Sequence, residues 1–75
     1  MKARQIVEGF PQRLGRLLYE HEVTTIELAE SIGVERKSIT YWQLGHTCPS
    51  AYHLARLATY FNVSADYLLF GEGKT

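Results

Sequence analysis

The chain has 75 residues, which suits one small domain near the lower limit of what a single hydrophobic core can stabilise. Its 45% hydrophobic and 21% charged residues exclude a disordered chain. Eight basic and eight acidic side chains cancel, so the chain is not polybasic, and any attraction to a polyanion must come from local placement of charge.

The cysteine content and the hydropathy of the sequence indicate the cellular compartment of the protein. Cys48 is the single cysteine, so an internal disulfide is excluded and a reducing environment is favoured. The first residues, MKARQIVEGF, lack the apolar run of a signal peptide, and no segment approaches the roughly 20 apolar residues that span a bilayer. We therefore expect a cytoplasmic protein.

Helical periodicity runs along the chain, and no segment alternates as a strand would. Pro11 suits a first helical position, and the residues after it predict a helix to about Glu20, although Gly15 weakens it. The apolar stripe of this helix consists of Leu14, Leu17 and Leu18.

Thr24 and Glu27 have the spacing of a capping box, which predicts the start of a second helix. Gly33 can adopt the left-handed conformation that ends it. Its buried stripe consists of Leu28, Ala29 and Ile32. A third helix begins one or two residues after Gly33 and ends at Gly45, and its apolar positions are Ile39 and Trp42.

Two further helices follow the loop from His46 to Pro49. Ser50 can cap the fourth helix, which Asn62 ends, and its apolar positions are Leu54, Leu57, Ala58 and Phe61. Ser64 can cap a short fifth helix, ADYLLF, which Gly71 closes. The sequence thus predicts an all-α, compact five-helix domain over residues 10–71, with an N-terminal arm at 1–9 and a C-terminal tail at 72–75.

The second and third helices, with the tight turn at Gly33 and Val34, have the layout of a helix-turn-helix. Because Ile39 and Trp42 face inward, the opposite face of the third helix displays Arg36, Lys37, Thr40, Tyr41 and Leu44. Arg36 and Lys37 lie in its first turn, where they oppose the positive end of the helix dipole. Two bases placed against this preference indicate a negatively charged target.

In helix-turn-helix DNA recognition, the start of the second helix of the motif enters the major groove. We therefore expect base contacts from Arg36, Lys37, Thr40 and Tyr41, with the two bases donating to guanine O6 and N7. The amides at the start of the preceding helix, beside Thr24 and Thr25, can bind a phosphate.

The run from Val23 to Gly71 resembles the Cro/phage-repressor (XRE-like) helix-turn-helix family. The positions in the family's order are Thr24, Leu28, Ala29, Ile32, Gly33, Val34, Ile39, Trp42, Gly45, Pro49, Leu57, Ala58, Val63 and the closing LLFG. The resemblance implies a lambda-repressor-like DNA-binding domain that acts as a transcriptional regulator, without enzymatic activity or a cofactor. It also implies a homodimer on palindromic double-stranded operator DNA. The expected phosphate contacts are at Thr24, Thr25, Ser38, Leu44, His46 and Thr47.

The expected mechanism is repression by operator occupancy, in a bacterium or its phage. An antitoxin of the same fold, which binds a toxin protein as well as its own promoter, stays within this interpretation. The alternative is a protein-interaction module that kept the fold and lost its affinity for DNA. The neutral chain favours this alternative, as do four glutamates without a basic residue between positions 17 and 34.

The sequence departs from the family pattern in two ways. The family commonly has an arginine at the position of Leu18 paired with a glutamate at the position of Gln43. Replacing both members of a buried pair can be neutral, so we interpret this as a compensated exchange, with Leu18 packing near Trp42. Leu44 stands where the family often has a polar side chain, so main-chain amides near Gly45 would have to bind the phosphate.

Several features have competing interpretations. The spacing of His46, Cys48 and His53 resembles a metal site, but structural zinc sites generally use four ligands, so we expect no metal. Cys48 and His53 lack the third group of a nucleophilic site. Lys2 and Arg4 form either a DNA-contacting arm or a frayed terminus. In the fifth helix, Tyr67, Leu68 and Phe70 belong either to the core or to a dimer interface.

Overall fold

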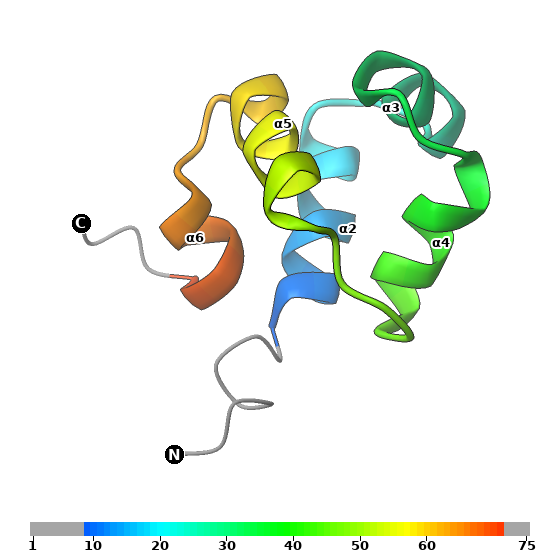
Figure 1. Ribbon diagram of the computed structural model, residues 1–75. Coiled ribbons are helices and arrows are strands. Elements are labelled where there is room, and N and C mark those ends of the chain that lie inside the picture. The colour runs from blue at the N-terminus through cyan, green and yellow to red at the C-terminus, as the bar shows by residue number, and fades with distance from the viewer. Residues whose placement is uncertain (1–8, 72–75) are drawn as a thin grey trace.

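The computed structural model describes residues 9–71, which form five helices and no strand (Figure 1). With the labels of Figure 1, these are α2 (Phe10–Glu20), α3 (Thr25–Ile32), α4 (Arg36–Leu44), α5 (Ala51–Phe61) and α6 (Ala65–Phe70). The predicted all-α fold is confirmed. The sequence interpretations at residues 1–8 and 72–75, including the arm with Lys2 and Arg4, lie outside the described residues.

Most helix ends lie where the sequence signals predict them, but α4 begins at Arg36, three residues after Gly33 and slightly later than predicted. Thr24 Oγ1 accepts a hydrogen bond from the Glu27 amide (3.1 Å), and the Thr24 amide donates to Glu27 Oε1 (3.0 Å), which confirms the capping box. The hydroxyl groups of Ser50 and Ser64 cap α5 and α6. Asn62 adopts the left-handed conformation (φ 59°) that ends α5. Local side chains therefore fix the start of α3, α5 and α6, whereas α2 and α4 begin without a side-chain cap.

The apolar stripes of the five helices meet in one core. Its buried members are Phe10, Leu14, Leu17, Leu18, Leu28, Ala29, Ile32, Ile39, Trp42, Leu57, Phe61 and Leu68. The predicted stripes are confirmed, except that Leu54 and Ala58 are half-buried and pack against the core from outside. Isolated helices shorter than about 12 residues are marginal in water, so packing on this core holds the helices together.

Helix α6 contributes both a core residue and an exposed one. Leu68 is fully buried and Tyr67 is half-buried, whereas Phe70 is exposed. The carbonyl end of α6 lies against α2, where the Arg13 guanidinium donates to the carbonyl oxygens of Leu68 and Leu69. The last helix is therefore joined to the first described one, although the two are far apart in sequence (Figure 1). Of the helices in residues 9–71, none combines the length and the apolar character needed to cross a bilayer.

Candidate nucleic-acid interface

The turn between α3 and α4 sets the angle of the helix that carries the predicted contacts. Gly33 adopts φ 79°, a left-handed conformation that a side chain would strain. The amides of Gly33 and Val34 both donate to the carbonyl oxygen of Ala29, at 2.9 and 3.0 Å. These two hydrogen bonds to one carbonyl oxygen close α3. The chain then turns into α4, which begins after Glu35.

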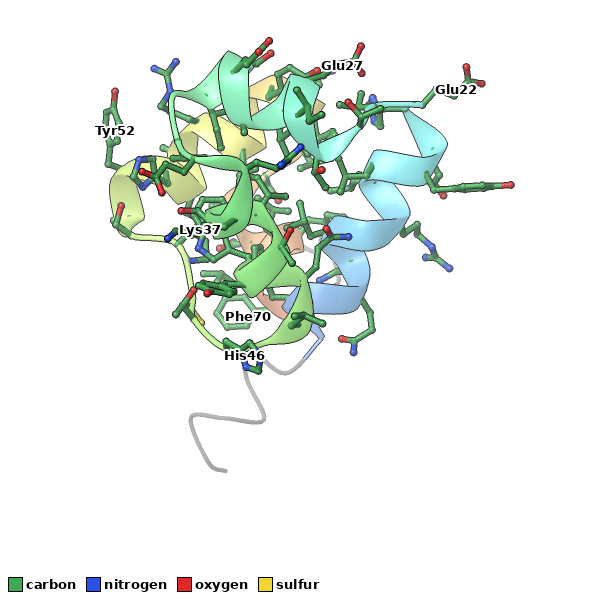
Figure 2. The ribbon with its side chains drawn as sticks, turned by 90° about the vertical axis from the view of Figure 1, so that its right-hand side faces the viewer. Glu22, Glu27, Lys37, His46, Tyr52 and Phe70 are labelled. Atoms are coloured by element: carbon green, nitrogen blue, oxygen red, sulfur yellow. The ribbon has the colours of Figure 1, made fainter. Side chains whose placement is uncertain are left out.

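Helix α4 has one buried face and one solvent-exposed face. Ile39 is fully buried and Trp42 is 5% exposed, so these two side chains anchor the helix to the core. The exposed side chains are Arg36, Lys37, Thr40, Tyr41 and Leu44. In Figure 2 the side chains of Lys37 and His46 lie on the same side of the molecule, toward the two ends of α4. The structure thus places the four residues predicted to contact bases on one exposed face.

Helix α2 supports α4 from behind. Gln43 is half-buried, and its Nε2 lies 3.6 Å from the point where a Cβ on Gly15 would stand, so the glutamine amide lies over this glycine. Leu18 and Trp42 both belong to the buried cluster of the core. Among the described residues, that cluster contains no polar or charged side chain, so replacing the family's arginine and glutamate together leaves no unpaired charge.

A contact that the sequence did not predict fixes the end of α3. Arg56 on α5 donates from Nε to the carbonyl oxygen of Ile32 (3.2 Å) and from Nη2 to that of Ser31 (3.3 Å). Its guanidinium also lies 5.7 Å from the ring centroid of Tyr52, and Nη1 is 3.4 Å from the Tyr52 hydroxyl. The last carbonyls of α3 are therefore capped from α5, immediately before the turn. Only the i, i+4 spacing of Tyr52 and Arg56 was visible in the sequence.

The predicted phosphate contacts differ in their availability. Thr24 already accepts a hydrogen bond from its own helix, but its hydroxyl hydrogen remains a donor. Thr25 and Ser38 are half-buried, and His46 and Thr47 are exposed. Thr24 and Thr25 lie at the start of α3, Ser38 lies on α4 itself, and His46 and Thr47 lie in the loop that follows α4.

Two of the main-chain amides near Gly45 already donate within the end of α4. The Gly45 amide donates to Trp42 O (3.2 Å), and the His46 amide donates to Tyr41 O (3.0 Å), because both close the end of α4. These two amides are thus engaged within the helix end, and the expected phosphate contact through amides near Gly45 stays a prediction. The His46 ring, which lies edge-on to Tyr41 with centroids 5.9 Å apart, offers a side-chain donor in their place.

Charge is segregated over the surface. The ion pair found within residues 9–71 joins Arg16 and Glu20, so neither Arg36 nor Lys37 is neutralised by a described side chain. Figure 2 shows Glu22, in the turn after α2, and Glu27, in the first turn of α3, along the upper edge of the view and away from Lys37. The positive charge of this face is thus concentrated at the start of α4.

His53 and Cys48, which belong to the H-x-C-x4-H pattern of the sequence, have no metal-site surroundings among the described residues. His53 Nδ1 is hydrogen-bonded to Ser50 Oγ (3.1 Å), and its ring packs near Trp42 and Tyr52. Cys48 is exposed in the loop before α5. Over residues 9–71, no three ligating side chains come close enough together to hold a metal ion.

Comparisons with known proteins agree with this geometry. A family model described as Helix-turn-helix matches residues 16–68. The chain is similar to the HTH-type transcriptional activator BcrR of Enterococcus faecalis, with 33% identity over 63 residues, or 84% of this chain and 31% of that protein. It is also similar to the crystal structure of a transcriptional regulator from Listeria innocua, with a TM-score of 0.78 and 36% identity over 88% of this chain and 61% of the other. The chain spans less than two thirds of either protein. Because the family model covers more than half of its residues, the chain belongs to the Cro/C1-type (XRE-like) helix-turn-helix family of transcriptional regulators.

Proposed function

We propose that this chain is a sequence-specific transcriptional regulator that inserts α4 into the major groove of double-stranded operator DNA. The family consists of DNA-binding regulators and not of enzymes. The observation that carries the proposal is the exposed face of α4, whose first turn bears Arg36 and Lys37 without a described ionic partner. Their position against the helix dipole is unfavourable in the isolated domain and becomes favourable beside a polyanion.

The residues of this face have complementary roles. Arg36 and Lys37 donate to guanine O6 and N7, and Thr40 places a hydroxyl or methyl group against a base edge. Tyr41 completes the base-reading set. Thr24 and Thr25, at the start of α3, bind one DNA phosphate. His46 and Thr47, in the loop after α4, bind another. Such backbone contacts fix the register of α4 without selecting sequence.

Two copies bound to a palindrome would place two α4 helices about one helical turn of DNA apart. The exposed ring of Phe70 and the half-buried Tyr67 on α6 are the apolar residues that we assign to the contact between copies. Bound in this way over a promoter, the dimer would exclude polymerase and repress transcription. A reporter fused to the bound promoter distinguishes repression from activation, since removal of the regulator raises expression in the first case and lowers it in the second.

The proposal is tested by selecting duplexes from a random library and measuring their affinity at several salt concentrations. We expect an enriched sequence with two-fold symmetry and a log–log salt dependence of several units, about 0.9 for each phosphate neutralised. The matched control is the double variant with Arg36→Ala and Lys37→Ala, which should enrich no sequence. Weak binding at low salt without any sequence preference by the unaltered chain would contradict the proposal.

The glutamate surface favours a second candidate function, a protein-interaction module. Its exposed members are Glu20, Glu22, Glu27 and Glu30, and Tyr19 beside them is 84% exposed. A toxin or another regulatory protein with a basic surface would suit this region. If the chain shows no DNA preference but copurifies with a basic protein, and replacing these glutamates by glutamine releases that protein, this second function holds.

A further inference from the structure

The exposed face of α4 changes in chemistry along the helix. Its first turn is charged, with Arg36 and Lys37, whereas its last turn presents Leu44, which is 62% exposed, next to Tyr41, which is 43% exposed. These are two of the large apolar side chains at the surface of the described residues. If α4 is the helix that enters the groove, as proposed above, this apolar end faces DNA as well.

The helical spacing places Leu44 in the middle of the DNA-facing stripe and not at its edge. An α-helix turns by about 100° and rises about 1.5 Å per residue, so Leu44 lies almost in line with Lys37 and about 10 Å further along the axis. Thr40 and Tyr41 occupy the turn between them. Ile39 and Trp42 point to the core on the opposite side.

The apolar end is held in place by its surroundings. The amides of Gly45 and His46 close α4, and the His46 ring packs edge-on against Tyr41. Behind the turn, Pro11 Cγ lies 3.7 Å from the point where a Cβ on Gly45 would stand, so the turn lies against the first residues of α2. Leu44 is therefore presented on a backbone that is fixed before DNA arrives.

The chemistry of Leu44 restricts what it can contact. Its side chain has no donor, and the two amides that follow it are already engaged within the helix end, so this position cannot donate to a phosphate through them. Pressing leucine against the polar edges of bases would leave those edges without hydrogen bonds. The one apolar group that the four bases present in the major groove is the C5-methyl group of thymine.

We infer that Leu44, together with the ring of Tyr41, forms an apolar contact for thymine methyl groups. The first turn of α4 then selects guanine and its last turn selects thymine. This inference rests on the proposed function, because it assigns the base class read by one part of the same face. It replaces the phosphate contact that the family resemblance implied at Leu44.

The test starts from the duplex enriched by the unaltered chain from a random library. Each thymine of the enriched site is replaced, one at a time, by deoxyuridine, which removes the methyl group and leaves the hydrogen-bonding groups unchanged. We expect one or two positions in each half-site where the replacement weakens binding about fourfold, the value of one buried methyl group. The other thymines should tolerate the replacement.

Variants at Leu44 show whether this side chain makes the contact. Leu44→Ala should bind the thymine duplex about fourfold to tenfold more weakly, and it should no longer distinguish thymine from deoxyuridine at those positions. Leu44→Met keeps an apolar side chain and should preserve the distinction. Tyr19→Ala, which removes an exposed aromatic side chain on α2, is the matched control and should leave both affinities unchanged. Because Leu44 is exposed, the helical circular dichroism of all variants should match that of the parent chain.

The outcomes separate this inference from the proposed function. If no sequence is enriched, the proposed function fails, and the inference fails with it. If a sequence is enriched but no thymine replacement lowers affinity, or if Leu44→Ala weakens both duplexes equally, the inference alone is overturned. The parent chain could show no thymine dependence while Leu44→Asn gains affinity for all duplexes. That result would overturn the inference and show that position 44 contacts the DNA phosphate backbone.

Discussion

The guanidinium of Arg13 donates from Nε to the carbonyl oxygen of Leu68 at 2.9 Å, across 55 positions of sequence. Its Nη2 donates to the carbonyl oxygen of Leu69 at 2.8 Å. The last carbonyls of a helix lack partners within the helix, so this arginine on α2 caps α6 from outside. One side chain thereby joins the first and last described helices and closes the domain around its core.

We expect Arg13→Met to lower the free energy of unfolding by about 1–3 kcal/mol, because charged hydrogen bonds are lost and two carbonyls are left unpaired. Arg16→Met on the same helix is the matched control. Arg16 is exposed and its ion pair with Glu20 spans 3.9 Å, so its replacement should change stability by less than about 0.5 kcal/mol. Urea denaturation measures both. Equal effects of the two replacements would contradict the assigned role of Arg13.

Gly15 and Gly33 should respond to alanine in opposite directions. Gly15 lies within α2 and a Cβ there would meet Gln43 Nε2 at an ordinary 3.6 Å, so Gly15→Ala should stabilise the chain by up to about 1 kcal/mol through helix propensity. Gly33 has φ 79°, so Gly33→Ala should destabilise it by about 1 kcal/mol. Thermal melting of the two variants gives the signs. Destabilisation by Gly15→Ala would show that Gln43 packs over position 15 only when no side chain is present there.

Replacing Arg56 by lysine should loosen the end of α3. Lysine keeps the charge but cannot donate in a fork to the carbonyl oxygens of Ser31 and Ile32. We expect faster hydrogen exchange at the amides of Gly33 and Val34, which close α3, by NMR. Tyr52→Phe, which removes only the longer 3.4 Å contact, serves as control and should leave these rates nearly unchanged. Similar rates in the parent and in Arg56→Lys would show that α3 ends independently of α5.

The contribution of the capping box at Thr24 and Glu27 to the free energy of unfolding should be measurable as well. Thr24→Ala removes the acceptor for the Glu27 amide and should cost about 1 kcal/mol, whereas Thr24→Ser should retain most of the stability. Chemical denaturation measures these differences. If Thr24 also contacts a phosphate, Thr24→Ala weakens binding to all duplexes by a similar factor, without changing sequence preference.

Arg36→Ala and Lys37→Ala separate DNA recognition from folding. Each should lose about 1–3 kcal/mol of binding free energy on the selected site and much less on random DNA. The melting temperature should stay the same or rise slightly, because a charge that opposes the helix dipole is removed. Titration of labelled duplexes and thermal melting give the two quantities. Equal losses on both DNAs would mean that the pair contacts phosphates and not bases.

The sequence by itself determined the helices, their ends and most of the core. Thr24 with Glu27, Ser50 and Ser64 act on amides within three residues, so their effect is readable from local spacing. The same holds for the inward face of α4, because Ile39 and Trp42 are its apolar positions at helical spacing. Since the burial of these two residues decides which side remains exposed, the face with Arg36 and Lys37 also followed from sequence.

Only the tertiary structure decided which distant groups complete the helix ends. Arg13 meets α6 across 55 positions, and Arg56 meets α3 across 24, and no periodicity links such residues. In the same way, Gln43 rests on Gly15 only because α2 and α4 cross there. Local hydrogen bonds are encoded at fixed spacings, whereas contacts between helices depend on the packing of the whole core.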